Sequence, residues 1–158
     1  MLFSLATQAF YDPNANYGAN LPSDVLTVTA DQYTQFYSAI NDNKYIYKSG
    51  DDFLISDSRP DKYYAWDLAT NTWVITEAMA TKKQNDIAVA LKQTASSEVT
   101  RSSTQISILS DKLELLDFSG AETSDSVTAT LTLWKKYRIG CNSVVTGIAI
   151  ELPVAPDA

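Results

Sequence analysis

The sequence of 158 residues contains no histidine and a single cysteine, Cys141. Histidine is the usual general base near neutral pH, so its absence removes every Ser-His-Asp and Cys-His catalytic arrangement. A zinc site needs thiolates or imidazoles, and one cysteine cannot supply them. An internal disulfide is impossible for the same reason, which suits a reducing cytoplasm. The composition therefore predicts a protein that is not an enzyme and that holds no metal or cofactor.

Positive charge is also scarce, because 12 Lys and Arg residues face 19 Asp and Glu residues, giving a net charge of −7. This charge repels a phosphate backbone, so we expect no nucleic-acid partner. No uninterrupted apolar run approaches the roughly 20 residues that a membrane span needs. The first residues, Met1 to Leu5, lack the basic region and the long apolar core of a signal peptide. We therefore expect a protein that is made and used in the cytoplasm, with no membrane partner.

Residues 1–76 are rich in aromatic side chains and in short strand patterns. A strand is predicted over residues 25–29, after the turn that contains Pro22. A helix is predicted over residues 30–40, because Thr29 can cap its start and apolar residues follow at helical spacing. Two hairpins are predicted next, one from strands 45–47 and 53–55 and one from strands 63–67 and 72–75.

Residues 77–118 contain no Gly, Pro, Tyr or Trp. Their apolar residues recur at spacings of three, four and seven, as Ile87, Leu91, Ala95, Val99, Ile106, Leu109, Leu113 and Leu116. This pattern predicts one long helix, or two helices joined near Ser102, ending at Gly120. The stripe is expected either to pack against the sheet or to form an intermolecular coiled coil, which would make the protein a homo-oligomer.

A last helix is predicted from about Ser124 to just before Gly147, followed by a short strand over residues 148–150 and an extended tail. The apolar side of this helix carries Val127, Leu131, Trp134, Tyr137 or Arg138, and Cys141. The fold class is therefore α+β. We divide the chain into a β-rich N-terminal lobe, residues 1–76, and a helical C-terminal region with its tail, residues 77–158.

The stretch Leu131–Ile139 is the most informative segment for function. Trp and Tyr combine a large apolar area with a polar tip, and Arg presents a planar fork, so these residue types anchor protein interfaces. In the alternative, structural interpretation, Trp134 and Tyr137 pack against the sheet aromatics while the basic residues complement the helix dipole. The candidate partner-binding residues are Trp134, Lys135, Tyr137 and Arg138, with Trp66 and Trp73 as secondary candidates.

Carboxylates cluster in Asp51–Asp61 and in Asp111–Asp125. The glycine-bearing spacing of an EF-hand is absent from both segments. A hydrolase would need two carboxylates that face each other across a cleft, and the sequence singles out no such pair. Solvated loop acids are the favoured interpretation.

Several short motifs in order resemble the tail fibre assembly proteins of tailed bacteriophages and prophages. They are Leu21–Val25, Thr29–Tyr33, Lys48–Gly50, Ser58–Pro60, Leu133–Ile139, Asn142–Val144 and Pro153–Pro156. The core Leu133-Trp134-Lys135-Lys136-Tyr137-Arg138 is the family's most recognisable signature. The chain departs from the family pattern at Ser143-Val144-Val145, where Arg-Val-Asp is common, and at Leu152, where a tryptophan is common.

The resemblance implies a chaperone that binds the distal, C-terminal part of a homotrimeric tail fibre and helps it to fold and trimerise. Such proteins act in the cytoplasm of the bacterial host, and some stay on the fibre tip of the virion, where they contribute to host recognition. The alternative function is a receptor- or carbohydrate-binding tail-tip module, in which exposed tyrosines and tryptophans stack on sugars.

Overall fold

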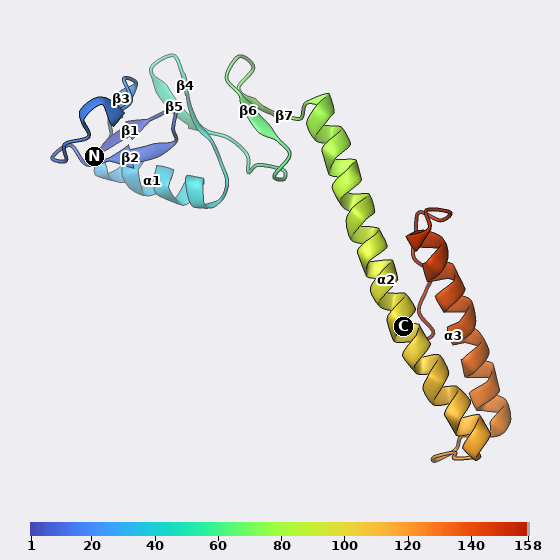
Figure 1. Cartoon of the computed structure of the whole chain (residues 1–158). Coiled ribbons are helices and arrows are strands. Elements are labelled where there is room, and N and C mark those ends of the chain that lie inside the picture. The colour runs from blue at the N-terminus through green and yellow to red at the C-terminus, as the bar shows by residue number, and fades with distance from the viewer. Residues whose placement is uncertain (158) are drawn as a thin grey trace. The chain divides into compact units, whose positions relative to one another are not determined.

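The computed structural model describes residues 1–157 and has the predicted α+β fold (Figure 1). The chain divides into two compact units, Met1–Ala80 and Thr81–Ala158. The strands are β1 (Leu2–Ser4), β2 (Ala9–Tyr11), β3 (Val25–Thr27), β4 (Ile46–Ser49), β5 (Asp52–Ile55), β6 (Ala65–Asp67) and β7 (Thr72–Val74). The helices are α1 (Ala30–Asn41), α2 (Glu77–Leu115) and α3 (Ser124–Val145), with a short 3₁₀ turn at Gly18–Asn20.

A three-stranded antiparallel sheet in the order β2-β1-β3 packs on α1 in the N-terminal unit. The core of this unit consists of Phe3, Val28, Phe36 and Ala39, together with Ile46 of β4. The predicted helix 30–40 is confirmed as α1. Its first turn is closed by a capping box, in which the Thr29 hydroxyl accepts from the backbone N–H of Gln32 and the Gln32 side chain accepts from that of Thr29.

The two predicted hairpins are confirmed as β4–β5 and β6–β7. The Gln8 side chain ties β4 to the rest of the unit, since its amide donates to the carbonyl of Ile46 at 2.9 Å and accepts from the N–H of Ile46 at 2.8 Å. Residues 63 and 64 lie outside β6, so the predicted strand 63–67 is too long. The reason is a turn, in which the Asp61 carboxylate accepts from the backbone N–H of Tyr63 at 2.8 Å.

Glu77–Leu115 forms a single helix, α2, which confirms the first of the two predicted alternatives, one long helix, over two helices joined near Ser102. The Ser and Thr hydroxyls in the polar middle of α2 donate to backbone carbonyls of the preceding turn, so they do not interrupt the helix. Ser102, for example, donates to the carbonyl of Glu98 at 2.7 Å. The helix ends at Leu115, and not at Gly120 as predicted. Leu116 takes the left-handed conformation with φ 56°, and the next N–H donates back to the carbonyl of Lys112 at 3.0 Å.

Helix α3 lies along α2 and confirms the predicted last helix, with Thr123 as its N-cap. The buried face of α3 packs against Val99, Ile106, Leu109 and Leu113 of α2. The expectation that the α2 stripe packs on the sheet is therefore wrong for this part of the stripe. The predicted strand 148–150 is also wrong, because the N–H groups of Ile148 and Ala149 donate to the carbonyl of Ser143 and cap α3 instead. None of the helices within residues 1–157 combines the length and the apolarity needed to cross a membrane.

Candidate partner-binding sites

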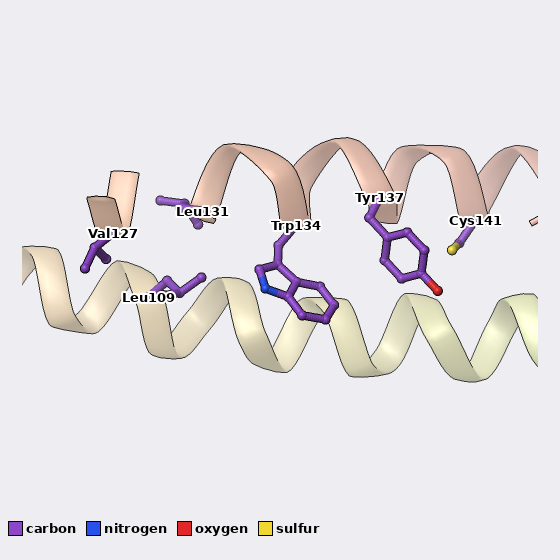
Figure 2. Packing of buried hydrophobic residues seen from close by; sticks show 6 residues of the cluster. All are labelled: Leu109, Val127, Leu131, Trp134, Tyr137 and Cys141. Atoms are coloured by element: carbon purple, nitrogen blue, oxygen red, sulfur yellow. The ribbon is translucent and has the colours of Figure 1, made fainter. Parts of the chain in front are cut away.

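Trp134 and Tyr137 lie in the core of the α2–α3 hairpin, where Figure 2 shows both side chains directed toward α2. Only 4% of Trp134 and 6% of Tyr137 is exposed. The two rings meet edge to face, with centroids 5.8 Å apart. The predicted packing against sheet aromatics is wrong, because Trp134 and Tyr137 contact Arg101 and Glu98 of α2 instead. In this arrangement both residues stabilise the hairpin, and their contact with a partner stays a prediction.

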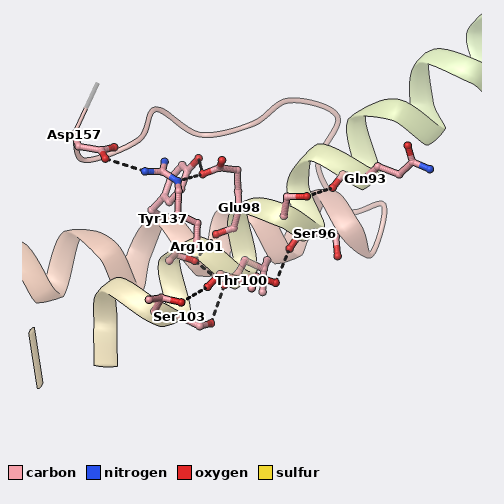
Figure 3. Close-up of polar contacts among 12 residues, drawn as sticks. Gln93, Ser96, Glu98, Thr100, Arg101, Ser103, Tyr137 and Asp157 are labelled. Atoms are coloured by element: carbon pink, nitrogen blue, oxygen red, sulfur yellow. Dashed lines mark hydrogen bonds and ion pairs between the residues drawn. The ribbon is translucent and has the colours of Figure 1, made fainter. Parts of the chain in front are cut away.

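Arg101 of α2 is the polar centre of this hairpin (Figure 3). Its guanidinium binds Glu98 at 2.7 Å and Asp157 at 2.8 Å, and it lies 4.9 Å from the centroid of the Trp134 ring. The Tyr137 hydroxyl donates to Glu98 at 2.8 Å. That bond, followed by the contact with Arg101, lowers the pKa of Glu98. Burial, followed by the bond to Glu98, raises the pKa of Tyr137 to about 12.

The C-terminal tail is fastened to the same hairpin. Leu152 and Ala155 pack against the hairpin core, and Asp157 is held by Arg101. The ring of Pro153 lies over Gly140 of α3, so closely that a Cβ at position 140 would be 2.9 Å from the proline Cγ. Glycine is therefore needed at this point of the helix for a close approach and not for a turn.

Arg138 and Lys135 are the two candidate residues of α3 that remain accessible. Lys135 is exposed, and Arg138 is half-buried. Arg138 lines an open groove between α2 and the C-terminal end of α3, together with Val99, Ser103, Ile139, Asn142, Ser143, Thr146 and Ile148. Cys141 is fully buried, as predicted, and burial raises the pKa of its thiol.

Trp66 and Trp73 face each other across the β6–β7 hairpin, as strand alternation predicts. Their ring centroids are 5.2 Å apart in an edge-to-face arrangement. Tyr45 of the neighbouring segment stacks on Trp66 at 4.9 Å, with an interplanar angle of 12°. The Trp73 indole N–H donates to the backbone carbonyl of Asp57 at 2.9 Å. The Trp66 indole nitrogen is buried and has no hydrogen-bond acceptor within residues 1–157.

These rings form one wall of a hollow that we call the aromatic cleft. Its lining consists of Tyr47, Ile55, Ser56, Asp57, Trp66, Asn71, Thr72 and Trp73. The two tryptophans were among the sequence candidates, whereas Tyr47 and the polar rim were not. Tyr45 and Tyr47 are two residues apart in the predicted strand 45–47, and this spacing is a signal that could have added Tyr47, because residues two apart on a strand share a face.

Among residues 1–157, no group of three or more Cys, Asp or Glu residues is arranged to hold a metal ion. Comparison of the chain with protein-family models, with curated proteins and with solved structures finds no match. The resemblance to tail fibre assembly proteins thus rests on the ordered motifs described above.

Proposed function

We propose that this chain is a tail fibre assembly chaperone, which binds the distal, C-terminal part of a homotrimeric phage tail fibre and promotes its folding and trimerisation. The observation that carries the proposal is the aromatic cleft, where Trp66 and Trp73 stand beside hydrogen-bonding groups. Aromatic side chains next to a polar rim are the typical composition of an interface centre. The ordered motifs that resemble the family supply the identity of the partner.

Open strand edges next to the cleft support the same function. Each of the hairpins β4–β5 and β6–β7 has two strands within residues 1–157 and therefore presents backbone groups that no third strand covers. Ile55 of β5 and Thr72 of β7 both line the cleft. A β-rich fibre that is still assembling exposes unpaired edges and apolar surface, which aggregate. A partner that covers both would raise the yield of trimer through binding energy alone, without catalysis.

Co-expression with the tail fibre gene of the same phage or prophage tests this function. We expect soluble fibre trimer, measured by pull-down and size-exclusion chromatography, only when both chains are made. Ile55→Glu places a charge in the cleft and is expected to lower trimer yield by roughly tenfold or more, which needs a loss of only about 1.4 kcal/mol of binding free energy. The matched control is Leu54→Glu, since Leu54 and Ile55 are each 40% exposed but Leu54 does not line the cleft.

Two results would count against the chaperone function. One is fibre trimer that forms equally well without this chain. The other is an equal loss of trimer with Ile55→Glu and Leu54→Glu, because such a loss would reflect a change of surface charge and not of the cleft. Circular dichroism of both variants establishes that they are folded before the yields are compared.

A second candidate function is recognition of a carbohydrate receptor by the same cleft. The observation that favours it is the combination of Trp66 and Trp73 with the polar side chains of Asp57, Asn71 and Thr72, because sugars offer both an apolar face and many hydroxyl groups. A glycan array with the isolated chain separates the two functions. Glycan binding without any fibre, lost in Ile55→Glu and kept in Leu54→Glu, would favour this function over the chaperone.

A further inference from the structure

Arg138 differs from the other two arginines of the chain in having no strong acceptor among residues 1–157. Arg59 donates to two backbone carbonyl oxygens, at 2.7 and 2.9 Å, and Arg101 binds two carboxylates. Within residues 1–157 the Arg138 guanidinium donates only to the Ser103 hydroxyl, at a distance of 3.5 Å. In a chain with 19 acidic and 12 basic residues, a half-buried arginine that binds no carboxylate stands out, because partly desolvated cations are normally paired.

The groove that Arg138 lines combines this cation with neutral hydrogen-bonding groups and an apolar rim. The polar lining comes from Ser103, Asn142, Ser143 and Thr146. The rim includes two aliphatic side chains that are unusually accessible, Ile139 with 67% and Ile148 with 82% of its surface exposed. These features are distinct from the aromatic cleft, which belongs to the other compact unit.

The charge of the groove selects the class of ligand. A guanidinium matches a carboxylate through two parallel N–H···O bonds. Among residues 1–157, Arg138 is the only charged residue in the lining, so the groove suits a single negative charge. The net charge of −7 disfavours the closely spaced phosphates of a nucleic acid. Lys135, one helical turn before Arg138, adds positive charge on the same helix. The accessible isoleucines favour apolar groups on either side of that charge.

We propose that this groove binds a carboxylate-bearing and otherwise apolar segment of a protein partner. Arg138 holds the carboxylate, and Ile139 and Ile148 contact the apolar side chains that flank it. The proposal does not rest on the chaperone function, because it follows from the lining of the groove alone.

A matched pair of peptides tests the groove on the whole chain. The ¹⁵N-labelled protein is titrated with acetyl-Leu-Glu-Leu-amide and, separately, with acetyl-Leu-Gln-Leu-amide, which has nearly the same shape without the charge. We expect chemical-shift changes at the Nε–Hε signal of Arg138 and at the backbone amides of Asn142 and Thr146. The glutamate peptide should bind roughly tenfold more tightly than the glutamine peptide, since charge-assisted hydrogen bonds are about twice as strong as neutral ones.

Substitutions in α3 show which residue is responsible for the chemical-shift changes. Arg138→Gln is expected to abolish the shifts caused by the glutamate peptide, and Arg138→Lys to weaken binding several-fold because the fork is lost while the charge stays. Lys136→Gln removes the same charge from the same helix outside the groove lining and should leave binding unchanged. Equal shifts with both peptides, or shifts that persist in Arg138→Gln, would overturn the proposal. If Arg138→Gln proves unstable, the comparison of the two peptides on the unaltered chain still shows whether the groove prefers a carboxylate.

Discussion

The hydroxyl of Tyr137 in α3 donates a hydrogen bond of 2.8 Å to the carboxylate of Glu98 in α2. The same carboxylate binds Arg101 at 2.7 Å, so a tyrosine from one helix and an arginine from the other share one acceptor. Arg101 also holds Asp157, which fastens the C-terminal tail to this point. Tyr137 thus belongs to a polar network that links α2, α3 and the C-terminal tail.

Tyr137→Phe tests how much the hydrogen bond from Tyr137 to Glu98 stabilises the folded state. The variant keeps the ring in the core and removes one donor from a charged acceptor, so we expect the free energy of unfolding to fall by about 1.5–3 kcal/mol at pH 7. The control is Tyr37→Phe, because Tyr37 is 56% exposed and the change should be within about 0.5 kcal/mol. Urea denaturation followed by circular dichroism measures both. Equal effects of the two substitutions would show that the bond from Tyr137 to Glu98 contributes no more than an exposed hydroxyl does.

The same bond predicts a dependence on pH. Because the hydrogen bond from Tyr137 lowers the pKa of Glu98 below its ordinary value of 4.5, the folded state binds the proton less readily than the unfolded state. The resulting stabilisation is complete above the unfolded pKa and is lost as the pH falls through the lower folded value. The difference between Tyr137→Phe and the unaltered protein should therefore shrink in acid. A difference that is constant from pH 7 into the acid range would contradict this linkage.

Local signals in the sequence predicted the elements well, because their causes are local. Thr29 caps α1 through Gln32, three residues away, and the alternation around Trp66 and Trp73 marks their hairpin. The packing partner of each apolar stripe is not a local property. Helical spacing shows that α2 and α3 have apolar faces, and either face could have packed on a sheet or on another chain. The end of α2 also escaped prediction, since leucine is rare in the conformation that Leu116 adopts.

For the candidate sites, too, the sequence indicated the residue types but not the contacts that depend on the tertiary fold. Trp134 and Tyr137 are residue types that serve both cores and interfaces, so composition alone cannot place them. Arg101 was not a candidate, although it contacts residues from three parts of the chain, because its partners lie as far away in sequence as Asp157. The grooves were not predictable either, since each is lined by segments that only the tertiary fold brings together.

Gly140→Ala tests the contact between α3 and the tail. In an open helix, alanine in place of glycine raises stability by roughly 0.5–1 kcal/mol. Here the new Cβ would lie 2.9 Å from the Cγ of Pro153, so we expect no gain and a displaced tail. In the background Pro153→Ala, which removes the ring, the same substitution should recover the gain. Thermal unfolding of the two single variants, the double variant and the unaltered chain measures this coupling. Additive effects would show that the tail does not press on position 140.

Leu116→Gly tests the strain at the end of α2. Leu116 has a φ of 56°, and the left-handed conformation costs a side-chain-bearing residue about 1–2 kcal/mol relative to glycine. Because 73% of its surface is exposed, its removal sacrifices little packing, and we expect the free energy of unfolding to rise by about 0.5–1 kcal/mol. The matched control is Leu115→Gly, one residue earlier and 74% exposed. Leu115 is the last residue of the helix, where glycine is unfavourable, so this variant should lose stability. Chemical denaturation of the two variants side by side decides the matter: if both lose stability, Leu116 is not strained and the turn owes its form to another contact.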